Sequence, residues 1–513
     1  MPAKFVPIEA LPDLVFGLVG PIGVDLEYTS NSISDSVKSF GYTTHNISIT
    51  KIMRELVSDI LIDESDLSTG YRTKIEYAND LRKKYDSNDL LAALVISAIS
   101  KIRREDPQQN LNIERVGRAF IIRQFKTPEE IRLMRSVYNK SFIQISVNGS
   151  PQKREDYLAS RIKLSSRGTK TDEEARTMSR HLIKTDSKEE YTYGQNVIDT
   201  FPMGDVFLDF SDKDKSNHAI NRFMAALFGS NEITPTKDEY GMYLAKTASL
   251  RSSDLSRQVG AAIFSQNGEI ISLGSNEVPK AGGGTYWAEG NIDARDFQLG
   301  FDPNEQNKSE IFADLVARLF EDKFLSAELQ ALGEVRQIID RLFNNQNKYK
   351  YKDSRVMNII EFGRIIHAEM SAICDAARNG TGIGNATMYV TTFPCHICAK
   401  HVVASGIRRL VYLEPYPKSY THQLHADSIQ IDDHTDESKV HFQPFLGIAP
   451  YRYRDLFEKG KRKNSRGEAM KWKSNPPRPN IETSVPIYRQ AEEHDSATLG
   501  KLIAPSNQVT STE

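Results

Sequence analysis

The sequence predicts an α/β protein with two main domains, the first built on a largely parallel sheet. At 513 residues the chain is several times the usual size of one domain. Strand-like and helix-like runs alternate through its first part, a pattern typical of parallel sheets flanked by helices. Charged and turn-forming residues at 211–237 interrupt this alternation, and we expect the domain boundary there.

The composition narrows the function classes. With 39% hydrophobic and 26% charged residues, the chain fits a folded enzyme, and its net charge of -2 provides no overall attraction to nucleic acid or anionic membranes. The N-terminus lacks the pattern of a secretory signal, and no run approaches the roughly 20 apolar residues of a membrane span. We therefore expect a cytoplasmic protein with no membrane partner. Three cysteines are too few for a disulfide framework.

The first domain is expected over residues 1–225. An apolar run at 14–20 predicts a buried strand, which leads into a Pro/Gly turn and then a polar stretch compatible with a helix start at 29–41. Further runs follow, helical at 89–105 and 127–140 and strand-like at 118–125 and 140–148.

The second domain is expected over residues 236–473. A helical run at 239–252 precedes two strand-like runs, and Asn267-Gly268 between them predicts a hairpin. Helical spacing at 302–345 predicts an insertion over about 295–355. Residues 474–513 are rich in proline, polar and charged residues, so we expect a flexible tail. Between insertion and tail the sequence predicts helix, strand, helix and strand at 365–380, 386–392, 394–406 and 408–415.

A metal-binding pattern lies in this last group of elements. His367 and Glu369 occupy one predicted helix, and Cys395 and Cys398 follow Pro394 at the start of the next. An imidazole and two thiolates are ligands that tetrahedral Zn²⁺ prefers, and three protein ligands leave the fourth position to water. This order of residues matches the signature of zinc-dependent nucleobase deaminases. The sequence therefore predicts Zn²⁺ on His367, Cys395 and Cys398.

Glu369 is the predicted catalytic residue. It lies only two residues from His367 and so cannot be assumed to bind the same ion. Bound zinc can lower the pKa of water to about 7, which supplies a nucleophile at neutral pH. The expected role of Glu369 is to carry a proton from that water to the base and the departing amine.

Other interpretations of the same residues remain open. An isolated C-x-x-C can be a redox or chance pair, and a structural zinc site would need a fourth ligand. His396 and His401 are the nearest candidates for that ligand, but His396 inside the C-x-x-C is poorly placed and His401 could be an ordinary surface residue of the helix. We expect Cys374 to be a small buried apolar residue rather than a ligand.

With these residues in place, segments 238–283 and 360–422 resemble the deoxycytidylate deaminase family, which has the cytidine-deaminase-like α/β/α fold. The family often has a His-Cys associated with an accessory zinc, but GGGTYWAEGN stands there in this chain, so no second metal is expected. The likeness also implies ligands for the substrate phosphate, named below, although solvated surface charge explains these residues equally well. The likeness implies a sugar contact from Asn276, a base pocket lined by Val259, Gly260 and Ala261, and phosphate contacts from Arg251, Arg257 and Lys280.

The first half is similar to P-loop nucleoside and nucleotide kinases through GLVGPIGVDL, which implies a bound nucleotide near Gly17, Gly20 and Gly23. A working loop continues as G-K-[ST], but Val24, Asp25 and Leu26 stand there, so kinase activity is not expected. A nucleotide sensor, an assembly element or a partner-binding module fits better. A glycine turn that only packs a helix against a strand is an equal alternative.

The combined arrangement resembles bacterial anti-phage dCTP deaminases. That likeness implies conversion of free deoxycytidine nucleotides, dCTP and dCMP, to deoxyuridine nucleotides, restrained until infection by the N-terminal domain or by an inhibitory RNA. The fold family is commonly homo-oligomeric. One alternative is a polynucleotide-editing deaminase, for which the basic run 457–473 is the only dense candidate surface and is more simply a solvated, partly disordered segment. The other is a nucleotide-sensing regulator with a structural zinc.

Overall fold

The computed structural model divides the chain into two compact units. Unit 1 comprises residues 1–239 and 446–513, and unit 2 comprises residues 240–445. Each unit contains a six-stranded sheet with helices beside it, so the predicted α/β class is confirmed. The structure describes residues 11–105, 117–167, 169–187, 193–290, 292–343, 351, 354–432, 435–481 and 485–503.

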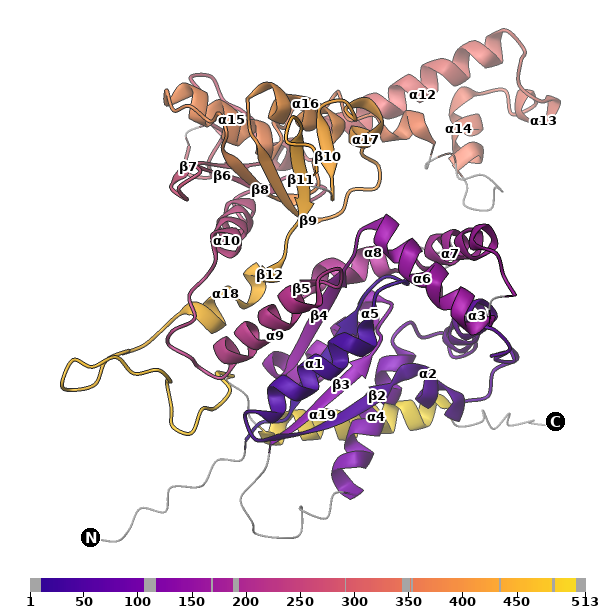
Figure 1. The fold of residues 1–513 in the computed structure, drawn as a ribbon. Helices are drawn as coiled ribbons and strands as arrows, with labels where there is room; N and C mark the ends of the chain where they lie inside the picture. The colour runs from indigo at the N-terminus through magenta and orange to yellow at the C-terminus, as the bar shows by residue number, and fades with distance from the viewer. Residues whose placement is uncertain are drawn as a thin grey trace, which may run out of the picture. The chain divides into compact units, whose positions relative to one another are not determined.

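The sheet of unit 1 has the order β12-β5-β4-β1-β3-β2 (Figure 1). Its strands are parallel except β12, which pairs antiparallel with β5. The parallel part agrees with the alternating pattern of the sequence. The strands are β1 (Leu14–Val19), β2 (Tyr42–Ser48), β3 (Gly117–Arg123), β4 (Phe142–Asn148), β5 (Val206–Asp209) and β12 (Gly447–Ile448).

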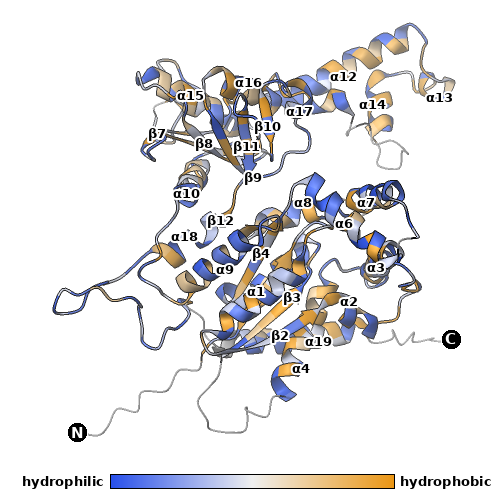
Figure 2. Cartoon of the chain, viewed as in Figure 1, coloured by the Kyte–Doolittle hydropathy of each residue, from blue (hydrophilic) through white to orange (hydrophobic). Residues whose placement is uncertain are grey.

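Helices cover both faces of this sheet because successive side chains of a strand point to opposite faces. Val15 and Val19 of β1 enter one core, whereas Leu14, Phe16 and Leu18 enter the other. Apolar residues accordingly concentrate along these strands (Figure 2). The helices of unit 1 are α1 (Leu26–Lys38), α2 (Ile49–Ile52), η1 (Met53–Glu55), α3 (Leu67–Lys84), α4 (Leu90–Glu105), α5 (Pro128–Tyr138), η3 (Asn139–Ser141), α6 (Pro151–Ser165), α7 (Asp172–Ser187), α8 (Val197–Thr200), η4 (Phe201–Met203), α9 (Lys213–Leu227), α18 (Pro450–Phe457) and α19 (Val485–Ile503).

The C-terminal segment corrects two sequence predictions. The expected end of the second domain at residue 473 is wrong, because the chain from 446 onward belongs to unit 1, where β12 extends the sheet. The flexible tail expected at 474–513 is wrong for α19, although 482–484 and 504–513 lie outside the described residues. A two-residue strand and a mostly polar helix have no distinctive sequence pattern, so composition was misleading here.

Helix α19 is held against α4 by a buried charge cluster. Arg103 of α4 donates to Asp13 Oδ2 at 2.9 Å and to Glu492 Oε1 at 3.0 Å, and all three side chains are almost fully buried. Tyr488 and Leu499 of the same helix join the adjacent core. The helix is therefore an integral part of unit 1.

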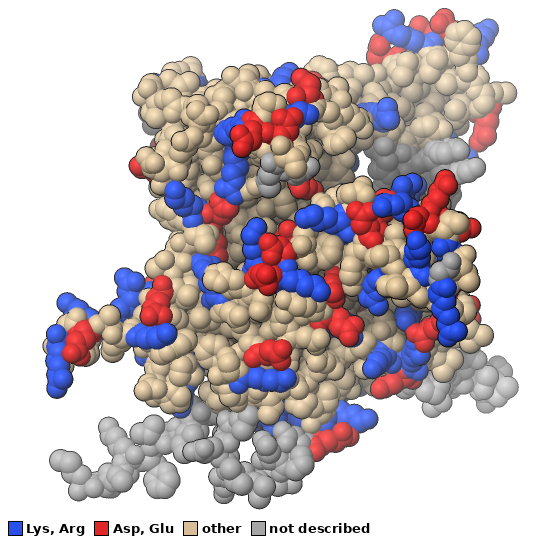
Figure 3. Space-filling model, viewed as in Figure 1, with Lys and Arg blue, Asp and Glu red and all other residues tan. Residues whose placement is uncertain are grey.

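The basic run 457–473 is also structured. Met470 N donates to Arg462 O at 2.9 Å, and Asn231 N donates to Lys471 O at 2.7 Å, which ties the run to unit 1. Its expected partial disorder is therefore not seen, although many of its side chains are exposed. On the face shown in Figure 3, basic and acidic side chains are interspersed.

Unit 2 has a mixed sheet in the order β10-β11-β9-β8-β6-β7. Strands β6 and β7 form the antiparallel hairpin that Asn267-Gly268 predicts, while β8 to β11 run parallel. The strands are β6 (Gly260–Phe264), β7 (Ile270–Ser275), β8 (Thr387–Thr392), β9 (Arg409–Glu414), β10 (Ile429–Ile431) and β11 (Val440–Pro444).

The helices of unit 2 include the predicted insertion. Phe312, Val316 and Ile338 give the insertion a small core of its own, while residues 344–350 and 352–353 lie outside the described part. Among the described helices of the chain, none combines the length and apolar content needed to cross a membrane. The helices are α10 (Lys237–Ser249), α11 (Asp296–Leu299), α12 (Pro303–Glu321), α13 (Ala327–Gln330), α14 (Val335–Phe343), η6 (Arg355–Asn358), α15 (Ala368–Arg378), α16 (His396–Ala404) and α17 (Thr421–Leu424).

The buried cluster at α19 makes a direct prediction. Replacing Glu492 with alanine leaves part of the charge of Arg103 without its partner, and should lower the free energy of unfolding of unit 1 by about 3 kcal/mol. Urea denaturation would be followed through Trp472, which packs in unit 1, in a Trp287→Phe background. The exposed neighbour Glu493→Ala is the matched control, and an equal effect of both changes would contradict the integral role of α19.

Candidate metal centre and catalytic cavity

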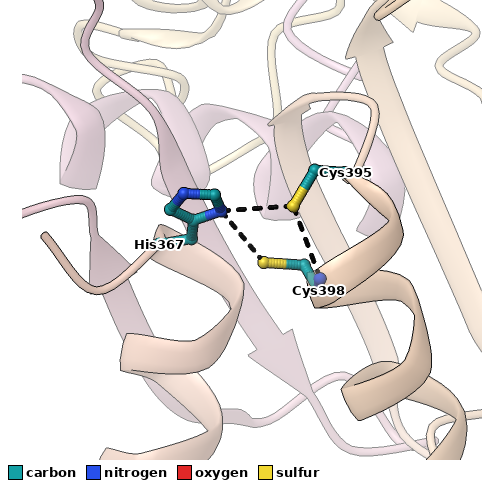
Figure 4. Close-up of side chains that lie close together, drawn as sticks. All are labelled: His367, Cys395 and Cys398. Carbon is teal, nitrogen blue, oxygen red and sulfur yellow. Dashed lines mark hydrogen bonds between the residues drawn. The ribbon is translucent and has the colours of Figure 1, made fainter. Parts of the chain in front are cut away.

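Two helix starts bring three potential metal ligands together. His367 directly precedes α15, Cys395 directly precedes α16, and Cys398 lies in the first turn of α16. His367 Nδ1 lies 3.3 Å from Cys395 Sγ and 3.3 Å from Cys398 Sγ (Figure 4). Cys398 N donates to Cys395 Sγ at 3.4 Å, which fixes the turn of the C-x-x-C. The predicted metal ligands thus converge on one point.

The spacing of these atoms fits a small tetrahedral ion. A nitrogen at 2.0–2.1 Å and a sulfur at 2.3 Å from tetrahedral zinc lie about 3.5 Å apart, close to the two distances here. Among the described residues, no further histidine, cysteine or carboxylate joins the group. His396 Nε2 instead lies 3.8 Å from Glu361 Oε1. The set of three could therefore hold a metal and leave a position for a non-protein ligand.

The protonation of the cluster follows from its hydrogen bonds. Hydrogen bonding to Cys395 raises the pKa of His367 to about 9, and bonds from Cys398 and His367 lower the pKa of the Cys395 thiol. The hydrogen bond with Cys395 and burial raise the pKa of the Cys398 thiol, so a metal that binds here would have to displace the proton of Cys398.

Glu369 occupies the first turn of α15, two residues after His367. Its side chain is buried, and burial raises the pKa of its carboxyl above the usual range. It lines the same cavity as His367 and Cys395. A carboxyl in this environment is suited to accept and return a proton.

A cavity of about 370 Å³ opens at the cluster, within the range of small-molecule sites. Its wall comes from four parts of unit 2, namely the segments around β6 and β7, the insertion, the start of α15 and the loops after β8 and β9. The lining residues are Asp254, Ser256, Arg257, Val259, Asn276, Asp302, Asn304, Glu305, Lys308, Met357, Asn358, Ile359, Ile360, His367, Ala368, Glu369, Thr392, Phe393, Cys395, Tyr416 and Lys418.

Three of the residues expected to bind substrate line this cavity: Asn276, Val259 and Arg257. Asn276 Oδ1 accepts from Val259 N at 2.7 Å, and its Nδ2 donates to Asp254 Oδ2 at 3.0 Å and to Arg257 O at 2.9 Å. Both amide donors of Asn276 are therefore used within the protein. Only its oxygen has capacity left for a substrate hydroxyl.

The other four expected substrate residues do not line the cavity. Gly260 and Ala261 are buried in β6, and a Cβ at Gly260 would lie 1.9 Å from Ala245 O, so this glycine allows α10 to approach the strand. Arg251 stacks on Trp287 at 3.6 Å and donates to Tyr286 O at 3.1 Å. Lys280 is an exposed residue in a turn.

The sequence analysis missed the contribution of the insertion. Asn304 and Lys308 of α12 line the cavity, together with segment 357–360. Lys418, after β9, donates to Asn358 Oδ1 at 2.8 Å and so joins the two walls. No spacing pattern relates these positions, because the chain between them folds separately.

Cys374 differs from expectation as well. It is exposed on α15, not buried, because the helix turns that position away from the sheet. Among the described residues, the group that could hold a metal does not include Cys374.

Comparisons with known proteins agree with this geometry. Residues 235–414 match the family model for the cytidine and deoxycytidylate deaminase zinc-binding region. Deoxycytidylate deaminase of Enterobacteria phage T2 is 59% identical over 54 residues, which are 10% of this chain and 29% of that protein. Deoxycytidylate deaminase of Pongo abelii is 24% identical over 175 residues, 34% of this chain and 63% of that one.

The chain thus spans about three tenths of the length of the phage relatives it matches. A crystal structure of dCMP deaminase from cyanophage S-TIM5 aligns at 14% identity over 41% of this chain and 98% of that chain. Its TM-score is 0.22, so the sequence match and not this superposition identifies the segment. Residues 235–414 are therefore the part of the chain that is similar to the cytidine and deoxycytidylate deaminase zinc-binding region.

Proposed function

We propose that this chain is a zinc-dependent enzyme that hydrolytically deaminates the cytosine of free deoxycytidine nucleotides, dCMP, dCTP or both. The observation that best supports this proposal is the buried carboxyl of Glu369, which lies in one cavity beside the group of His367, Cys395 and Cys398. A structural zinc site would need neither the cavity nor the buried acid. The proposed products are the deoxyuridine nucleotide and ammonia.

In this proposal His367, Cys395 and Cys398 hold the zinc, which when bound supplies a water that is nucleophilic at neutral pH. Glu369 takes the proton that the water gives up and delivers it to the ring nitrogen N3. It then helps the exocyclic amine leave as ammonia. Burial supports this role because it raises the pKa of the Glu369 carboxyl and so makes the protonated form easier to reach.

The phosphate end of the substrate is assigned to Arg257 and Lys418. Both line the cavity, and neither has an ion-pair partner among the described residues. By contrast, Lys308 pairs with Glu305 at 2.5 Å, which cancels its charge. Because Arg257 and Lys418 form no direct ion pair, both can bind a phosphate, and we expect a nucleotide to bind better than a bare nucleoside.

The finer parts of the proposal rest on the likeness of the whole chain to anti-phage dCTP deaminases. We propose that depletion of dCTP is the physiological outcome, and that unit 1 restrains activity through a bound nucleotide or an inhibitory RNA. Homo-oligomeric assembly belongs to the same likeness. We also propose that the N-terminal unit is related to the P-loop kinases, and its largely parallel sheet is compatible with that class.

The first test is a substrate panel. The zinc-loaded full chain would be given dCMP, dCTP, CTP, deoxycytidine and single-stranded DNA, with ammonia release measured and the product identified by mass. Glu369→Gln should lower turnover by about 10²- to 10⁴-fold, because the proton carrier is lost, while zinc content stays unchanged. Turnover of DNA alone would reject the free-nucleotide proposal, and full activity in Glu369→Gln would reject the role of this residue.

A second test separates phosphate recognition from chemistry. Lys418→Ala removes a charge-assisted contact of about 1.5–3 kcal/mol, so kcat/KM for dCMP or dCTP should fall about 10- to 100-fold. The value for deoxycytidine should change little. Lys280→Ala is the matched control, since Lys280 is exposed and does not line the cavity. Equal losses on nucleotide and nucleoside would show that Lys418 supports the fold instead.

A further inference from the structure

The glycine turn between β1 and α1 is not used by the proposed deaminase chemistry. Gly23 has φ +93°, and a Cβ at Gly20 would lie 2.7 Å from Val24, so the turn is tight at both glycines. Gly17 belongs to β1 instead, where a Cβ would meet Phe142 and Phe125. Turns that join a strand to a helix in this way present backbone N–H groups that bind phosphates in other proteins.

In this protein a carboxylate already occupies the turn. Asp186, in the last turn of α7, accepts from Ile22 N at 2.5 Å through Oδ2. Its Oδ1 accepts from Lys126 Nζ at 2.5 Å. The Asp186 side chain is 2% exposed, so the carboxylate is bound by an amide and an ammonium and shielded from water.

Lys126 provides the cation that the turn itself lacks. The residue follows β3, which pairs directly with β1, and its Nζ also donates to Gly20 O at 3.2 Å. Gln124 Nε2 donates to the same oxygen at 2.9 Å. Lys126, just after the neighbouring strand β3, therefore brings an ammonium group to the turn. The turn has no lysine of its own, because Val24 and Asp25 stand where a working phosphate loop has glycine and lysine.

Helices α6 and α7 seal this arrangement. Ile22, at the tip of the turn, is buried in a cluster with Leu158, Ile162 and Leu182 of the two helices. In the first turn of α1 the N–H of Tyr28 is also occupied, because it donates to Asp25 Oδ1 at 3.0 Å. An anion that bound to Ile22 N and Lys126 Nζ would therefore have to replace the carboxylate of Asp186.

We propose that Ile22 N–H and Lys126 form a latent phosphate-binding site, and that Asp186 is the internal ligand that keeps it occupied. An amide N–H and an ammonium bind a phosphoryl group by the same charge-assisted hydrogen bonds that hold this carboxylate. Phosphate and the closed position of α7 therefore compete for one set of donors. A phosphorylated ligand that binds there favours the form in which α7 has withdrawn.

The test asks whether phosphate can replace the carboxylate. Asp186→Ala leaves a buried ammonium and amide without a partner, so the variant should melt at a lower temperature than the wild type. Inorganic phosphate should restore part of that loss, and equilibrium dialysis should show phosphate affinity at least about tenfold above wild type. Adding Lys126→Ala to the variant should abolish the gain.

Two controls keep the result decisive. Asp172→Ala removes an exposed carboxylate from the same helix, so it reports the general effect of phosphate salts on stability. Asp186→Asn keeps the shape of the side chain and serves if the alanine variant does not fold. Equal phosphate affinity in wild type and both Asp186 variants would overturn the proposal, as would a gain that survives loss of Lys126. Neither readout depends on deaminase activity.

Discussion

The convergence of His367, Cys395 and Cys398 is the constraint on which the candidate metal site depends. These side chains meet only if α15 and α16 begin at neighbouring points, and the two helices are in contact. Gly274 of β7 makes this possible, because a Cβ there would lie 2.1 Å from Ala368 O at the start of α15. Ser272 Oγ then donates to Ala372 O at 2.9 Å and fixes the helix on the strand. A glycine outside the cavity thus sets the position of His367 and Glu369.

A second constraint lies where the chain leaves and re-enters unit 1. Glu239 is fully buried, and its carboxylate accepts two bonds of 2.7 Å from Arg222. The same carboxylate accepts from Ile448 N at 2.9 Å, and Gly447 has φ +122°, which lets the backbone pass close to it. Unit 2 is inserted between two segments of unit 1. The carboxylate of Glu239 binds the end of the first segment to the start of the second.

The residues of the candidate site could be predicted from sequence because they lie close along the chain and follow a fixed spacing. His367, Glu369, Cys395 and Cys398 were predicted from metal-ligand chemistry together with their match to the signature of zinc-dependent nucleobase deaminases. Contacts between distant segments gave no such signal, as the contact between Ile22 and Asp186, 164 positions apart in the sequence, illustrates. The same limit hid the packing of α19 on α4 and the wall that Lys308 and Asn358 contribute to the cavity. Resemblance placed Gly260 and Arg251 at the substrate, whereas packing and stacking determine their positions here.

The most direct test of the central claim is zinc K-edge X-ray absorption on the metal-loaded full chain. The account predicts two sulfurs at about 2.3 Å, one imidazole nitrogen at about 2.0–2.1 Å and one light ligand that is not imidazole. Three or more sulfurs, no sulfur, or a second imidazole would contradict it, because the site would then be closed by protein or built from other residues.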